Sequence, residues 1–128
     1  MLEQILTVIQ DTEILGKKIQ MYGSIEDLLF VAGDVADWID YAKNPNGSRQ
    51  TSKMVKSIDD EEKLVVKVLL PDDDQTRECI VLTEDGLYEV CMQSRKPIAK
   101  QMKKEIKQYL KSIRLIGAAI PEGMRKKW

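Results

Sequence analysis

The chain has 128 residues, of which 43% are apolar and 32% are charged, so it can form one compact domain but not a second large one. No run approaches the roughly 20 apolar residues that span a bilayer, and the start MLEQILTVIQDTE lacks the features of a secretory signal, which predicts an intracellular protein. Because the sequence contains no histidine, zinc sites with His ligands, Cys–His nucleophiles and Ser–His–Asp triads are excluded, and we expect neither an enzyme nor a cofactor.

The first half of the chain predicts a hairpin followed by two short helices. Residues 12–15 and 17–22 have a strand pattern on either side of Gly16. A short helix is predicted over 32–39, and the turn-forming stretch 41–47 ends it. Ser48 is expected to cap a second helix over 49–58, with Met54, Val55 and Ile58 inward and with three basic residues outward, Arg49, Lys53 and Lys56. This pair of helices fits either a DNA-reading helix-turn-helix unit or a cover for a sheet, and the sequence leaves both open.

The second half predicts another hairpin and then two helices. Residues 64–70 and 78–83 are rich in β-branched side chains and are joined by the turn PDDDQTR, so we expect them to pair antiparallel. A short helix is predicted over 87–94, and a long one starts at Pro97 and is closed by Gly117. Cys79 and Cys91 lie among apolar residues and are expected to be buried free thiols. The predicted fold is α+β, a small antiparallel sheet packed with short helices and one long C-terminal amphipathic basic helix.

Positive charge is concentrated in that long helix. Residues 1–94 contain nine basic and nineteen acidic residues, whereas residues 95–128 contain eleven basic and two acidic ones. Between Arg95 and Arg114 only Glu105 is acidic, and basic residues at helical spacing share one face, opposite Met102 and Ile106. Such a face is a candidate surface for a polyanion.

Five motifs in this order resemble the N-terminal domain of the BRO family found in phage antirepressors (Bro-N). They are the D-V-A of residues 34–36, DDEEK at 59–63, G-L-Y at 86–88, S-R-K-P-x-A-K at 94–100 and S-I-R at 112–114. The resemblance covers roughly residues 12–118, which leaves 1–11 as an N-terminal extension and 119–128 as a C-terminal tail. The chain departs from the family pattern at Glu105, where a Trp is usual. Lys111 replaces a usual proline, so we expect a straighter and longer helix, and Asp40 stands at a usual turn glycine.

The resemblance implies a transcriptional regulator of the antirepressor type, encoded by a phage or prophage and present in the cytoplasm of a bacterial host. The leading hypothesis is binding of double-stranded DNA by the basic helix and by the outward residues of the second short helix. The alternatives are a protein that sequesters a repressor without touching DNA, and a homodimer whose basic helix docks on the acidic face of its mate. The candidate DNA contacts are Arg49, Lys53, Lys56, Arg95, Lys96, Lys100, Lys103, Lys104, Lys107, Lys111 and Arg114.

Overall fold

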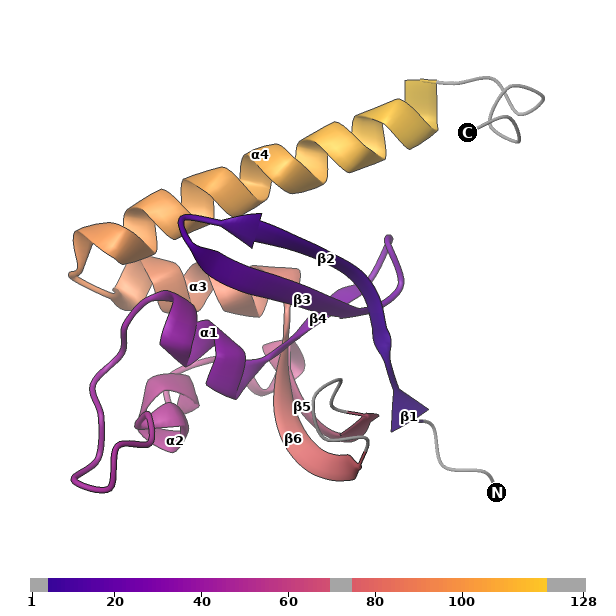
Figure 1. Cartoon of the computed structure of the whole chain (residues 1–128). Helices are drawn as coiled ribbons and strands as arrows, with labels where there is room; N and C mark the ends of the chain where they lie inside the picture. Colours follow the sequence, from indigo (N-terminus) through magenta and orange to yellow (C-terminus); the bar gives the residue numbers. More distant parts are fainter. Residues whose placement is uncertain (1–4, 70–74, 120–128) are drawn as a thin grey trace.

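The protein folds as one mixed β-sheet with helices packed mainly on one face (Figure 1). The computed structural model describes residues 5–69 and 75–119, with side chains described up to residue 115. The strands follow the order β1-β5-β6-β4-β3-β2 across the sheet, in which β1 runs parallel to β5 and the other neighbouring pairs are antiparallel. Their bounds are β1 (Ile5–Leu6), β2 (Val8–Ile14), β3 (Lys17–Gly23), β4 (Leu28–Val31), β5 (Lys63–Leu69) and β6 (Thr76–Thr83).

The helices come in two pairs, one after β4 and one after β6. The first pair is α1 (Ala32–Trp38) and α2 (Thr51–Val55), followed by a short 3₁₀ helix, η1 (Asp60–Glu62). The second pair is α3 (Glu84–Gln93) and α4 (Pro97–Ala119). The long helix α4 runs across the top of the molecule in Figure 1, above α1 and α3 and beside the hairpin of β2 and β3. This arrangement confirms the α+β fold with a long C-terminal helix.

The main core lies between the helices and one face of the sheet. Alternate residues of the central strands point into it, including Met21 of β3, Phe30 of β4 and Leu82 of β6. Phe30 and Trp38 meet edge to face with ring centroids 6.0 Å apart. Helix α4 contributes one apolar stripe to this core, made of Ala99, Met102, Ile106 and Leu110. Its other face is therefore turned to solvent.

A smaller cluster lies on the opposite face of the sheet. Tyr22, Val31, Val68 and Val81 are buried there, and Leu6 and Val8 pack against them. The residues at the start of the described chain are thus integrated into the sheet. They pair through β1 and through the first part of β2.

Several local predictions are confirmed. The hairpin around Gly16, the helix after residue 31 and the antiparallel pair β5 and β6 are all present. Met54, Val55 and Ile58 are buried as expected. Helix α4 continues without a break over 23 residues, as expected from the missing proline, and Asp40 has a φ of 55°, the left-handed conformation that glycine adopts most easily. The predicted turn at 71–74 and the tail from residue 120 lie outside the described residues.

Four local predictions are wrong. Ser48 does not cap the second helix, because its hydroxyl bonds Asn46 and Asn44 within the preceding loop and α2 starts only at Thr51. Gly117 does not close α4, because the helix continues to Ala119. A glycine inside a helix lowers its stability by only about 1 kcal/mol relative to alanine. Helix α3 starts at Glu84 rather than at residue 87, because the Thr83 hydroxyl caps it by accepting from the Gly86 N–H at 3.1 Å. Cys79 is only partly buried, whereas Cys91 is buried.

Candidate nucleic-acid interface

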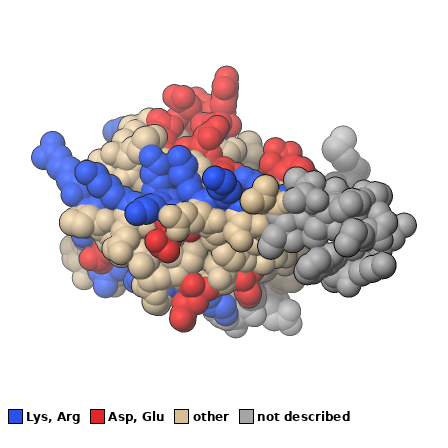
Figure 2. Space-filling view, turned by 90° about the horizontal axis from the view of Figure 1, so that it is seen from above, with Lys and Arg blue, Asp and Glu red and all other residues tan. Residues whose placement is uncertain are grey.

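The solvent-facing side of α4 presents a continuous row of lysines. Figure 2 views the molecule from above and shows basic side chains gathered in a band across it, with acidic side chains mostly on either side of the band. Four of the lysines are exposed and Lys103 is partly buried. We call this set the lysine stripe; it consists of Lys100, Lys103, Lys104, Lys107 and Lys111.

Among the residues that the structure describes, no carboxylate forms an ion pair with the lysine stripe. The ammonium group of Lys107 lies 5.1 Å from the centre of the Tyr88 ring, a cation–π contact that orients it without neutralising it. A groove of about 440 Å³ between α3 and α4 is lined by four of the lysines together with Cys91 and Met92. The stripe is thus a positive surface on a rigid helix, available to an anionic partner.

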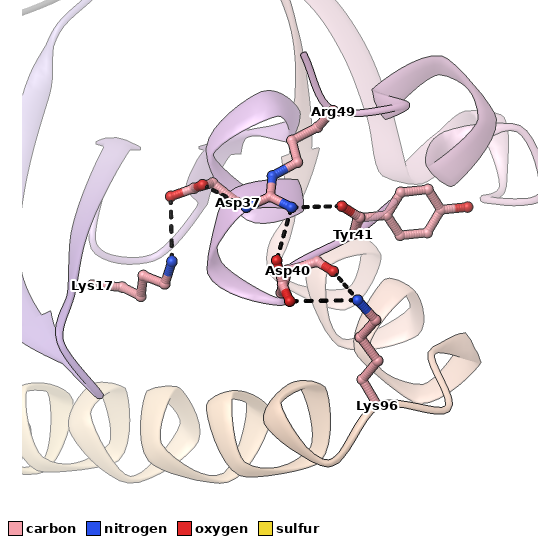
Figure 3. A network of polar contacts seen from close by, with 6 residues as sticks. All are labelled: Lys17, Asp37, Asp40, Tyr41, Arg49 and Lys96. Carbon is pink, nitrogen blue, oxygen red and sulfur yellow. Dashed lines mark hydrogen bonds and ion pairs between the residues drawn. The ribbon is translucent and has the colours of Figure 1, made fainter. Parts of the chain in front are cut away.

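Arg49 and Lys96 belong to a different site, a polar network around Asp40 (Figure 3). The Arg49 guanidinium contacts Asp40 at 2.8 Å and Asp37 at 3.1 Å, and it donates to the Tyr41 carbonyl at 2.7 Å. The Lys96 ammonium lies 3.5 Å from the Asp40 carboxylate and also donates to the Asp40 carbonyl. The network ties the loop before α2 and the start of α4 to the end of α1.

The same contacts shift the ionisation of the network. The hydrogen bond from Arg49 lowers the pKa of the Asp40 carboxyl, and the positive charge of Lys96 lowers it further. The pKa of Arg49 is raised in turn, mainly by its hydrogen bonds to Asp37 and Asp40. Only 14% of the Arg49 side chain is exposed. Arg49 is therefore occupied inside the protein rather than presented to a ligand.

Arg114, at the far end of the described side chains, is also occupied. Its Nε and Nη2 donate to the Ile25 carbonyl at 3.1 and 2.8 Å, and Nη2 lies 2.8 Å from a Glu84 carboxylate oxygen. The other Glu84 oxygen accepts from the Tyr88 hydroxyl at 2.8 Å. Burial, and then the bond to Glu84, raises the pKa of Tyr88, and the Glu84 contact raises the pKa of Arg114. Arg114 holds α4 against α3 and against the loop before β4.

The remaining candidates lie apart from the stripe or at its edge. Lys53 and Lys56 are exposed, but they belong to α2 and the residue after it, on the far side of α1 from α4 in Figure 1. Arg95 is exposed immediately before α4. The structure therefore brings five of the eleven candidates together as the lysine stripe and uses three in ion pairs. It places two on or directly after α2 and leaves Arg95 just before α4. Helix α2 has five residues, too short to run along a DNA groove.

An acidic cleft beside α4 was not predicted from the sequence. The cleft has a volume of about 380 Å³ and is lined by acidic residues of three separate segments, Glu26, Asp27, Glu62, Glu84 and Asp85. Arg114 joins this cleft to α4 through Glu84. Acidic pairs stand out in the sequence at 26–27, 61–62 and 84–85, but nothing local indicates that the sheet brings them together. Within the described ranges, no group of three or more Cys or acidic residues has a geometry that could hold a metal ion, and no helix is long and apolar enough to cross a membrane.

Comparison with known proteins supports one assignment. The family model for the BRO family, N-terminal domain, matches residues 18–112, about three quarters of the chain. Searches of curated proteins and of solved structures gave no significant match. The matched region runs from β3 to α4 and includes the motifs at 34–36, 59–63, 86–88 and 94–100. The chain therefore belongs to the BRO family and carries its N-terminal domain.

Proposed function

We propose that this domain binds double-stranded DNA through the lysine stripe and acts as an antirepressor-like transcriptional regulator of a phage or prophage. The BRO N-terminal domain is a regulatory family associated with phage antirepressors and DNA-binding regulators. The observation that carries the proposal is the lysine stripe itself, because its cations have no acidic partner among the described residues. The folded helix already fixes the backbone positions of these cations, so binding an anion orders only their side chains.

The length of the stripe suits a DNA backbone. Lys111 lies eleven positions after Lys100, about 16 Å along the axis at the 1.5 Å rise of an α-helix. Phosphates of one DNA strand advance by about 3.4 Å along the duplex axis, so the stripe is long enough to meet several of them. Lysine is a point charge without the planar fork of arginine, which favours phosphate contact over base recognition.

The test is fluorescence anisotropy of a labelled random-sequence duplex, titrated with the full chain at several salt concentrations. If all five lysines neutralise phosphates, the slope of log K against log salt is about −4.5, and affinity falls on the order of 10²- to 10³-fold between roughly 50 and 200 mM salt. Absence of binding at low salt would overturn the proposal. A flat salt dependence would remove the stripe as the interface.

Two double variants of equal charge locate the interface. Lys104→Glu with Lys111→Glu reverses two exposed cations of the stripe, and Lys53→Glu with Lys56→Glu makes the same charge change on and beside α2. We expect the first pair to weaken DNA binding by more than about tenfold and to flatten the salt slope, and the second pair to change it much less. All four positions are exposed, so thermal stability should move by less than about 0.5 kcal/mol in each. Equal losses in both would show that net charge, not α4, sets the affinity.

The acidic cleft favours a second candidate function, binding of a basic protein segment. That segment belongs either to a repressor, which the domain then sequesters, or to a second copy of this chain, whose lysine stripe is complementary to the cleft. Light scattering at low and high salt tests the second copy directly. A dimer that dissociates in salt and is lost in Lys104→Glu with Lys111→Glu would support it, whereas a monomer at all salt concentrations would exclude it.

A further inference from the structure

Two exposed glutamines share the solvent-facing side of α4 with the lysine stripe. Gln101 and Gln108 are exposed, and neither forms a hydrogen bond with a residue that the structure describes. Other glutamines form hydrogen bonds with side chains of the protein itself. Gln10 donates to the Tyr109 hydroxyl at 2.6 Å, and Gln93 accepts from Ser57 at 2.6 Å. The two α4 side chains therefore keep both a donor and an acceptor free for a ligand.

Their spacing repeats that of the lysines. Gln101 and Gln108 are seven residues apart, which is two turns of helix and about 10.5 Å, and each stands three residues before an exposed lysine, Lys104 or Lys111. A ligand that lies along the lysine stripe therefore passes both glutamines. The side chains differ in what they can recognise, since lysine offers charge and glutamine offers a directed donor and acceptor pair.

Direct reading of an adenine uses such a pair. Glutamine can bond the N6 and N7 edges of adenine together in the major groove, which at about 12 Å wide admits one α-helix. Two arginines that could otherwise bond base edges are occupied, Arg49 by Asp37 and Asp40 and Arg114 by Glu84 and Ile25. Helix α4 has the length to lie in a groove, and α2 does not.

We infer that Gln101 and Gln108 are specificity-determining residues that read adenines in the major groove while the lysine stripe holds the adjacent phosphates. A separation of about 10.5 Å corresponds to roughly three base-pair steps of 3.4 Å, so the two adenines lie about three steps apart. The inference rests on the proposed DNA binding and adds sequence choice to it.

The experiment selects preferred duplexes from a random library with the full chain. Affinities are then measured for the selected site and for the site with each adenine replaced. For wild type we expect each replacement to weaken binding roughly 5- to 150-fold. Gln101→Ala and Gln108→Ala should each lose discrimination at one position while keeping the salt slope, because the lysine stripe is intact. Gln50→Ala is the matched control, since that side chain donates to the Lys43 carbonyl in the loop before α2, and it should leave discrimination unchanged.

The outcomes separate the inference from the proposed function. Salt-dependent binding without any selected sequence, or selection that survives both alanine variants, overturns the inference and leaves DNA binding in place. Discrimination lost in Gln50→Ala instead places the reading in the loop before α2 and also overturns it. No binding to any duplex overturns both. Unfolding curves for each variant guard against a folding defect, which is not expected at the exposed positions 101 and 108.

Discussion

Replacing Arg114 by alanine separates the structural cations of this domain from the functional ones. Arg114 makes two hydrogen bonds to the Ile25 carbonyl and an ion pair of 2.8 Å with Glu84, and its side chain is 32% exposed. Hydrogen bonds from a charged group contribute about 1.5 to 3 kcal/mol each when they are shielded from water. Solvent can replace part of these at a partly exposed site, so we expect Arg114→Ala to cost about 2 to 3 kcal/mol.

That loss is large enough to measure by thermal unfolding. For a domain of this size, 1 kcal/mol lowers the unfolding midpoint by roughly 3 to 5 °C, so a decrease of about 6 to 15 °C is expected by circular dichroism. Arg114→Lys retains the charge but not the planar fork, and it should restore less than half of the loss. At a temperature where each variant is folded, anisotropy should show nearly unchanged affinity for DNA and an unchanged salt slope.

The opposite result would refute this assignment. An unchanged midpoint, together with weaker DNA binding and a salt slope smaller by about one unit, would mean that Arg114 contacts a phosphate in the complex. Its contacts with Ile25 and Glu84 would then be incidental. Lys104→Glu with Lys111→Glu provides the comparison, because it is expected to reduce DNA binding and to leave the midpoint in place.

Three further predictions concern the fold. Gly86→Ala should lower stability by about 1 to 3 kcal/mol in urea unfolding, because a Cβ there would lie 2.6 Å from the Glu62 carbonyl oxygen. Asp40 has a pKa below its ordinary value of 3.8, so its carboxylate stabilises the fold fully above about pH 4 and progressively less as the pH falls through the folded-state pKa. When the pH is lowered from about 4 to 2, the melting temperature of Asp40→Asn should therefore fall less than that of the wild type. Burial raises the pKa of Cys91 from 9.0 to about 11, so at about pH 8 its thiolate fraction is about 100-fold lower than that of a free thiol, and it should react with a disulfide reagent only after unfolding.

The correct parts of the fold prediction came from patterns within short stretches of sequence. The hairpin around Gly16, the pair β5 and β6 and the apolar face of α4 follow from alternation and helical spacing within short stretches of sequence. The strands β1 and β4, with two and four residues, escaped prediction. Their strand conformation comes from pairing with distant strands, since β1 pairs with β5 and β4 pairs with β6, and no short sequence window contains that information.

The candidate site was predictable in composition but not in grouping. Helical spacing was enough to place the lysine stripe on one face of α4. It could not show that Lys96 pairs with Asp40, 56 residues away, or that Arg114 bonds Ile25, 89 residues away. Ion pairs of this kind depend on which segments the sheet and the helices bring together. For the same reason the acidic cleft, built from three segments, is invisible in the sequence.

The motifs that carry the family resemblance act largely within the fold. Gly86 allows α3 to pass close to Glu62, Lys96 anchors the start of α4 to Asp40, and Arg114 fixes the other end of α4 to Glu84. These three residues hold α3 and α4 in place, and their positions explain how α4 keeps one face free along its length. Substitutions at the motif residues should therefore appear first as lost stability. Substitutions along the lysine stripe, which forms no ion pair among the described residues, should appear first as lost binding. The two sets therefore provide separate tests of the fold and of the function.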